Sequence, residues 1–513
     1  MFAFIMRRLG VLLVILFGSS FILFNLTAIS GDPTEALRFS TDLKAKQQLA
    51  ALIKQLDLNT PPPLRYFKWL KGILGGFSGH INFGMTRSNE FVSARLASAI
   101  PTTLRLVTAA ALIAIVLGIM LGITTALRQY SRFDYVVTFF SFLMFSLPIF
   151  WVAVLLKEFL AIKFNDFLAS GHIPIGWAVG LSAATGLFWA GIFGSKRETF
   201  LKVLGAGFAA NLALLEFLSL SHWFSSPKLG PIVVFIFAIV IAYGVTAIST
   251  GLDQKPALRA SQTMAVVTLI IYYPVNYLFT HYASVWLLVG LLVATLGTAW
   301  LSGWYWSKID RRPAIRTAMI SGGLMGAIVI IDRLMQTWSP YLQMDGVNGR
   351  PIPTVGQADP LLSNPDFWTN LLDRSVHLFL PTIALTLISF AGYVRFSRGT
   401  LLEVLNQDYI RTARAKGLSE RTVIMRHAFR NTMIPLTTII VVDLAGIIGG
   451  AIITERVFGW SGMGTLFNNA IQGLDLNLLM GVFFCTATLS VLANLVADLL
   501  YSALDPRIRV GRK

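Results

Sequence analysis

The sequence contains a single cysteine and few charged residues. Cys485 has no second cysteine among the 513 residues, so no disulfide forms within the chain. Only 13% of the residues are charged, whereas 55% are hydrophobic, and the mean hydropathy is +0.68. The apolar runs reach roughly twenty residues, the length that spans a bilayer. This composition excludes an ordinary soluble domain and places the chain among membrane proteins.

The sequence also lacks the motifs of common catalytic sites. No Gly-Lys dipeptide occurs, so the phosphate-binding loop of ATPases is absent. The six histidines do not have the spacing of metal ligands, and neither His-Glu-x-x-His nor Gly-x-Ser-x-Gly appears. Gly205 and Gly207 fit a loose dinucleotide pattern, but they lie inside an apolar run, which favours close helix packing. We therefore expect no catalytic residue, bound cofactor or bound metal in this chain.

Apolar runs recur along the chain and predict an all-α polytopic membrane protein of about twelve transmembrane helices. The predicted spans lie at 9–29, 101–127, 135–160, 174–194, 203–223, 230–250, 263–281, 284–304, 317–335, 377–396, 432–454 and 478–501. The first run follows Arg7 and Arg8 and is long enough to span, which favours a retained helix over a cleaved signal peptide.

The net charge of +17 is unevenly distributed among the predicted loops. Alternate loops hold most of the basic residues between the spans, namely Arg128, Arg132, Lys196, Arg197, Lys202, Lys255, Arg259, Lys308, Arg311, Arg312 and Arg316. Lys and Arg accumulate in cytoplasmic loops, so we expect these loops and both chain termini in the cytoplasm. The basic excess thus follows from insertion in a lipid bilayer, and we expect no nucleic acid as a partner.

A basic and mostly polar stretch at 408–431 separates two predicted spans. Its first nine residues favour a helix, and Gly417 suits the left-handed position that ends one. Ser419 is a good N-cap for a second helix, with Glu420 favourable in its first turn. We expect a helix, a bend and another helix that fit a groove on a soluble partner. A solvated loop would explain the arginines but not the placement of the small residues.

This stretch resembles the cytoplasmic coupling loop of a known family. YIRTARAKG at 409–417, RHAFRN at 426–431 and IP at 434–435 are similar to the loop of binding-protein-dependent ABC importers, in particular the first permease subunit of dipeptide and oligopeptide systems. The resemblance implies that the loop docks on separate ATPase subunits, which use ATP and Mg, and that this chain is not an enzyme. The residues that carry this expected role are Tyr409, Arg411, Thr412, Ala413, Arg414, Ala415, Lys416, Gly417, Arg426 and Pro435.

The loop departs from the general ABC pattern at two positions. Arg411 stands where that pattern has a glutamate, and Pro435 lies farther from the glycine. Both departures fit the peptide subfamily. They weaken any ion pair that the general pattern would assign to Arg411.

Other segments extend the resemblance to both ends of the chain. GDP at 31–33, AIPTTLRL at 99–106 and LPIFW at 147–151 resemble the family's N-terminal signatures, and ERVFGWSGMG at 455–464 and DLLYSALDPRIR at 498–509 its C-terminal ones. The resemblance implies a type I importer permease core of six helices in a bacterial-type inner membrane. A second homologous permease would complete the pathway, and an extracytoplasmic binding protein would deliver the peptide.

The middle of the chain departs from the family, which has only a short external connection there. About six spans are added, and an even number returns the chain to the same side. We expect the insert to form a peripheral helical bundle rather than a second pathway. The expected organisation is a first helix at 1–30, an external segment at 31–98, core helices two and three at 99–170, the insert at 171–340, an external loop at 341–376, and core helices four to six at 377–513 with the coupling loop at 397–431.

Two acidic residues are candidates to line a solute pathway. Asp443 lies deep in a predicted span and Glu158 near the outer end of another. The alternative role for Asp443 is that of a buried, hydrogen-bonded group. The acids are too sparse for a convincing proton relay, but an ion-gradient-driven transporter stays open as an alternative, as do a membrane scaffold and an ABC permease for nickel or another small solute.

Overall fold

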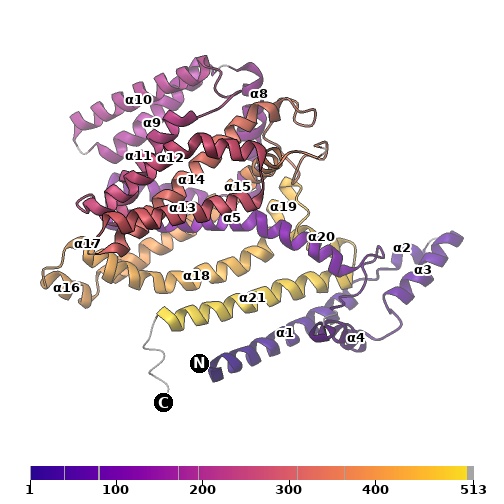
Figure 1. Cartoon of the computed structure of the whole chain (residues 1–513). Coiled ribbons are helices and arrows are strands. Elements are labelled where there is room, and N and C mark those ends of the chain that lie inside the picture. Colours follow the sequence, from indigo (N-terminus) through magenta and orange to yellow (C-terminus); the bar gives the residue numbers. More distant parts are fainter. Residues whose placement is uncertain are drawn as a thin grey trace. The chain divides into compact units, whose positions relative to one another are not determined.

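The computed structural model of the chain is built from helices (Figure 1). It describes residues 2–39, 41–78, 81–171, 173–194, 196–308, 310–362 and 364–504, without the side chains of 2–5, 36, 77–78, 170, 444–450, 497–498 and 500–504. In these ranges the β-structure amounts to one isolated bridge, between Met85 and Phe91. The predicted all-α fold is confirmed. The C-terminal signature beyond residue 504 lies outside the described residues.

The chain divides into two compact units. Unit 1 comprises Met1–Glu158, Thr354–Gln357 and Leu378–Lys513, and unit 2 comprises Phe159–Pro353 and Ala358–His377. Unit 2 therefore begins before the insert boundary predicted at 171, and it includes most of the predicted external loop at 341–376.

The helices preceding the second unit are α1 (Phe2–Ser30), α2 (Glu35–Arg38), α3 (Leu43–Gln55), α4 (Pro62–Leu74), the 3-10 turn η1 (Gly75–Ser78), α5 (Val92–Leu127), α6 (Arg132–Ser146) and α7 (Ile149–Leu156). The π-helical turn η2 (Lys157–Ile162) crosses the boundary. Unit 2 continues with α8 (Lys163–Ser170), α9 (Ile175–Phe193), α10 (Arg197–Leu220), α11 (Gly230–Ser249), α12 (Lys255–His281), α13 (Val285–Trp306) and α14 (Arg311–Leu342). Helix α15 (Phe367–Leu405) leads back into unit 1, which ends with α16 (Asp408–Ala415), α17 (Glu420–Thr422), the π-helical turn η3 (Val423–Ala428), α18 (Phe429–Gly450), α19 (Ile452–Phe458), α20 (Met463–Gln472) and α21 (Leu476–Leu504).

Among the described residues, ten helices are long and apolar enough to cross a membrane, or eleven if one bent pair forms a single span. The predicted number was about twelve. The span predicted at 432–454 corresponds to α18, and the side chains of its residues 444–450 lie outside the described set. A polytopic membrane protein is confirmed.

The predicted continuous span at 135–160 is wrong. Helices Arg132–Ser146 and Ile149–Ala169 meet at an angle of 104°. The break falls at Leu147 and Pro148, both in extended backbone conformations. Proline has no N–H for the helical ladder and disfavours the helical conformation of the residue before it, so this pair ends α6.

The helix predicted at 377–396 is longer at both ends. Helix α15 begins at Phe367 and ends at Leu405. The connection between α15 and α16 is therefore much shorter than predicted, because the predicted loop began at residue 397. The first part of the predicted coupling loop forms the last turns of this long helix.

Two glycines of α5 let α15 approach closely. A Cβ at Gly118 would collide with the Cβ of Tyr393, and one at Gly122 with the hydroxyl of Ser397. Ser397 is fully buried and donates a hydrogen bond to the Gly118 carbonyl at 3.2 Å. Small residues separated by three positions allow such contact between membrane helices. The pairing of Gly118 with Gly122 thus has a structural role, whereas the surroundings of the similar pair Gly446 and Gly450 lie outside the described residues.

Helix α4 packs on α1 through aromatic rings. Tyr66 is fully buried and hydrogen-bonds Ser20 at 2.9 Å. Its ring lies edge-on to Phe21 and Phe24 of α1, with centroids 5.1 and 5.5 Å away. The predicted external segment is therefore anchored to the first membrane helix, and Figure 1 shows α4 alongside α1.

Candidate functional site

The predicted coupling loop forms a helix, a bend and a second helical segment. Helix α16 ends in a Schellman motif, in which the N–H of Leu418 donates to the Ala413 carbonyl at 3.4 Å and that of Gly417 to the Arg414 carbonyl at 2.9 Å. Gly417 has φ +72°, which favours glycine. Ser419 then caps α17 by accepting from the N–H of Thr422. The predicted bend and cap are confirmed.

An ion pair closes this bend on its exposed side. The Arg414 guanidinium donates to both carboxylate oxygens of Glu420, at 2.7 and 3.1 Å. Bidentate pairs of this kind fix orientation as well as distance. The hydrogen bonds from Arg414 hold the pKa of Glu420 below its usual value, so the pair is charged at neutral pH.

Buried apolar residues hold the loop against two long helices. Ile410 and Val423 are fully buried and pack with Ala413, Ala126 of α5 and Leu401 of α15, in a cluster that also contains Ala428. Ala413 therefore faces the chain itself and not the outer surface of the loop. Its small size permits close packing between α16 and the bundle.

The remaining residues of the predicted set lie mainly on the outer surface. Those exposed are Tyr409, Arg411, Thr412, Arg414, Ala415, Lys416, Gly417 and Arg426. Met425 (52% exposed) and Leu418 (40%) add an apolar component that sequence reasoning missed. Pro435 is half-buried inside α18, away from this surface. The outer face combines basic charge with exposed apolar groups, as a docking surface does.

A partly buried ion pair joins the end of α15 to the start of α6. Arg398 donates to both oxygens of Asp134 at 2.9 Å. The Asp134 side chain is 3% exposed, and it also accepts from the Tyr130 N–H and the Thr138 hydroxyl. Sequence reasoning missed this pair, since its members lie in different predicted loops and helices.

A second buried cluster joins two of the family-like motifs. Glu455 of α19 is fully buried and accepts from the Thr103 hydroxyl of α5 at 2.6 Å and from the Thr465 N–H at 2.8 Å. Thr103 in turn accepts from the Met463 N–H at 2.8 Å. A Cβ at Gly462 would collide with both side chains. Thr103 and Glu455 thus fix the segment 455–465 onto α5, a role that the sequence did not reveal.

The two predicted pathway acids have different surroundings. Asp443 is exposed on α18, and the buried hydroxyl of Tyr393 interacts electrostatically with its carboxylate. Glu158 is half-buried in the turn η2. Its neighbour Lys157 donates to the Val457 carbonyl and lies 5.2 Å from the Phe458 ring centre. Asp443 is thus exposed in the single chain and has a polar neighbour in the Tyr393 hydroxyl.

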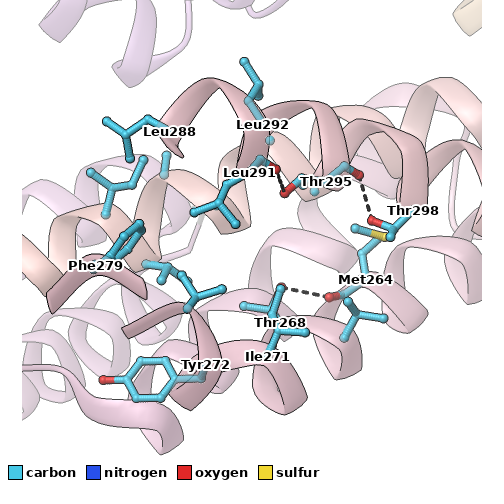
Figure 2. Close-up of a pocket in the computed structure, with 18 residues that line it drawn as sticks. Met264, Thr268, Ile271, Tyr272, Phe279, Leu288, Leu291, Leu292, Thr295 and Thr298 are labelled. Atoms are coloured by element: carbon cyan, nitrogen blue, oxygen red, sulfur yellow. Dashed lines mark hydrogen bonds between the residues drawn. The ribbon is translucent and has the colours of Figure 1, made fainter. Parts of the chain in front are cut away.

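Unit 2 contains an apolar cavity of about 300 Å³ between α12, α13 and α14 (Figure 2). Leucine, phenylalanine and glycine line it, together with three threonines whose hydroxyls donate to backbone carbonyls of their own helices. These hydroxyls are already paired, so the lining suits an apolar group and not a peptide. Among the described residues, no cluster of three His, Cys, Asp or Glu is placed to hold a metal ion.

Comparison with known proteins identifies the family. A family model described as binding-protein-dependent transport system inner membrane component matches residues 114–510. The oligopeptide transport system permease protein OppB of Mycobacterium tuberculosis is 36% identical over 184 residues, which cover 36% of this chain and 54% of that protein.

Two further relatives have similar names. The dipeptide transport system permease protein DppB of Escherichia coli is 45% identical over 140 residues, or 27% of this chain and 41% of that protein. The oligopeptide transport system permease protein AppB of Bacillus subtilis is 43% identical over 139 residues, which cover 27% of this chain and 44% of that protein. The chain spans about half the length of the curated relatives it matches. Because the family match extends over most of the sequence, the chain belongs to the family of binding-protein-dependent transport system inner membrane components.

Proposed function

We propose that this chain is the transmembrane permease subunit of an ATP-driven importer of di- or oligopeptides. It forms half of the translocation pathway, and a second homologous permease subunit forms the other half. The family match and the peptide transport systems named for the relatives support the substrate class. The chain resides in a bacterial-type inner membrane with both termini in the cytoplasm, as the distribution of basic residues favours.

The geometry of the loop at 408–431 carries the proposal. A short helix ends in a glycine bend, an ion pair fixes the bend, and a basic face with exposed Met425 and Leu418 points outward. This surface suits a groove on a soluble subunit. We assign that subunit as the ATPase, which binds ATP and Mg.

Movement of the docked loop is transmitted through its buried side. Ile410 and Val423 pack on residues of α5 and α15, so displacement of α16 displaces both long helices. The Arg398–Asp134 pair extends this connection to α6. ATP-driven closure of the ATPases therefore changes the arrangement of the helices that line the pathway.

Asp443 marks the pathway side of α18. An exposed carboxylate within a membrane helix is stabilised by water or a partner and not by lipid. A face toward the second permease and the solute satisfies this requirement. Its charge suits the ammonium group of a peptide, and we place Glu158, in the turn η2, on the same pathway.

The extracytoplasmic binding protein docks at the opposite end of unit 1. The segment 31–98 and the motif fixed by Thr103 and Glu455 form that end. The Asp475 carboxylate, directly before α21, accepts from the Arg87 N–H at 2.7 Å and ties the segment 31–98 to the C-terminal helices. A rigid platform of this kind suits the transfer of substrate between two proteins.

Copurification of the ATPases tests the proposal. The full chain is purified in mild detergent from its native host as wild type and as Ala415→Trp, which adds bulk on the exposed face of α16. We expect the wild type to capture ATPase subunits and the variant to capture at least about fivefold less, because a bulky ring prevents close docking.

Arg197→Trp is the matched control, since Arg197 is also exposed and begins α10, in another segment that is predicted to be cytoplasmic. It should capture as much ATPase as the wild type. Capture of no ATPase by the wild type, or equal capture by wild type and Ala415→Trp, would contradict docking at this loop.

A further inference from the structure

The insert contains an open groove of about 980 Å³ at one end of its helices. The lining comes from the end of α11, the start of α12, the end of α13 and the start of α14, so four helices converge on it. This end of unit 2 holds the segments 252–262 and 306–316, which were predicted as loops and which the charge pattern predicts to be cytoplasmic.

The charge of the groove is positive. Arg259, Lys308 and Arg316 line it, against a single carboxylate, that of Asp310. All three basic side chains are exposed, and none of them forms an ion pair within the described part of the chain. Their donors are therefore available to an anion.

One hydrogen bond and one cation–π contact fix Trp306 in the wall of the groove. The indole N–H of Trp306 donates to the Thr263 hydroxyl at 2.8 Å, and the Arg259 guanidinium lies 5.4 Å from the centre of that ring. Ring stacking restricts the guanidinium but leaves its edge free to donate. The wall therefore presents Arg259 in a restricted orientation.

Close packing beside the groove makes its helix ends rigid. The Ser302 hydroxyl donates to the Ala260 carbonyl at 3.0 Å, and Ser249 hydrogen-bonds Thr317 at 2.8 Å. The Ser307 hydroxyl donates to the Asp310 carbonyl at 2.6 Å, which closes the turn between α13 and α14. A site that is fixed before binding loses less entropy when its ligand arrives.

Exposed apolar side chains flank the charged residues along the same helices. Trp300, Leu301, Trp304 and Tyr305 of α13 are all between 44% and 70% exposed. Tryptophan and tyrosine gather where a bilayer meets water, and basic pockets between membrane helices bind anionic headgroups. A soluble anion would use the basic residues but not this apolar surface.

We propose that this groove binds the headgroup of an anionic phospholipid. Arg259, Lys308 and Arg316 hold the phosphate, Trp306 supports Arg259, and the acyl chains lie on the exposed apolar surface of α13. The insert thereby ties the permease to anionic lipid at the cytoplasmic face. This inference does not depend on the substrate of the transporter or on ATPase docking.

Native mass spectrometry of the purified full chain tests the proposal. The chain is titrated with phosphatidylglycerol and, separately, with phosphatidylcholine of the same acyl chains. We expect tighter binding of phosphatidylglycerol, weakened about tenfold or more in the triple variant Arg259→Gln, Lys308→Gln, Arg316→Gln, because each basic group near an anionic headgroup contributes to affinity.

Two further variants distinguish the effect of charge at this groove from the effect of the total charge of the chain. The triple variant Lys196→Gln, Arg197→Gln, Lys202→Gln removes the same charge from another predicted cytoplasmic loop, and it should bind like the wild type. The charge-preserving Arg259→Lys, Arg316→Lys should retain the preference for phosphatidylglycerol.

Three outcomes would overturn the proposal. Equal affinity for the two lipids excludes headgroup recognition. An equal loss in the control triple variant excludes this groove. Displacement of phosphatidylglycerol by millimolar inorganic phosphate identifies the ligand as a soluble anion and not a lipid.

Discussion

The hydroxyl of Thr103 donates a hydrogen bond to the buried carboxylate of Glu455 at 2.6 Å, across 352 positions of sequence. Thr103 belongs to the long helix α5, and Glu455 to the short helix α19. The same hydroxyl accepts from the Met463 N–H. One small side chain thus satisfies a buried carboxylate and a buried backbone donor, and it fixes two motifs of the sequence to each other.

Thr103→Val should destabilise the protein. Valine keeps the shape of the side chain but leaves the Met463 N–H and one Glu455 oxygen unpaired, at a cost of about 1–3 kcal/mol for such buried groups. The melting temperature of the detergent-solubilised chain measures the loss. Thr124→Val on the same helix is the control, because the Thr124 hydroxyl bonds only its own helix and is exposed. An unchanged melting temperature in Thr103→Val would contradict the role of this cluster.

The stability contributed by Glu455 should decrease as pH rises. Burial raises the pKa of Glu455 above the ordinary value of 4.5. The folded protein then retains this proton over a pH range in which the unfolded chain has lost it, so folding is favoured below that range and less favoured above it. The melting temperature of the wild type should therefore fall relative to that of Glu455→Gln as the pH rises above about 4.5. A difference that is constant with pH would show that Glu455 ionises as it does in the unfolded chain.

Asp134→Asn should lower stability and loosen the connection between α15 and α6. Removal of the carboxylate charge leaves Arg398, whose side chain is 27% exposed, without its countercharge, which costs about 1–3 kcal/mol. Thermal melting again measures the effect. Asp408→Asn is the matched control, since Asp408 is 97% exposed and lies 3.7 Å from Arg411. Similar melting temperatures for the two variants would show that the Asp134 pair contributes no more than a surface pair.

Gly122→Ala should disrupt the packing of α5 on α15. The added methyl group would collide with Ser397 and with the Val394 carbonyl, and such overpacking costs about 1–3 kcal/mol. The yield of folded, monodisperse protein on gel filtration reports the damage. Gly399→Ala on α15 has no atom within 4 Å of the added group and should behave as the wild type. If Gly122→Ala is equally well folded, the two helices separate more easily than the contact implies.

Local patterns predicted local structure well. Gly417 and Ser419 occupy the bend and the cap, because these residue types have strong conformational and hydrogen-bonding preferences. Pro148 was an equally local signal for the broken helix, but the apolar run around it suggested a continuous span. The π-helical turns at 157–162 and 423–428 had no comparable signal in the sequence.

Contacts between distant segments were not predictable from one sequence. The inward orientation of Ala413 depends on Ala126 and Leu401, which belong to two other helices. The sequence around Glu455 did not indicate a partner in α5. The sequence around Arg398 did not indicate Asp134. These contacts arise from the tertiary arrangement of long helices, whereas hydropathy and spacing record only which segments are helical and apolar.

Peptide uptake into proteoliposomes tests the central claim most directly. The complex captured by this chain is reconstituted, and uptake of a labelled oligopeptide is followed with its binding protein present. We predict uptake that requires ATP, persists when ionophores collapse the ion gradients, and is lost in Ala415→Trp but retained in Arg197→Trp. Uptake that requires an ion gradient and proceeds without ATP would contradict the assignment of this chain as an ATP-driven permease subunit.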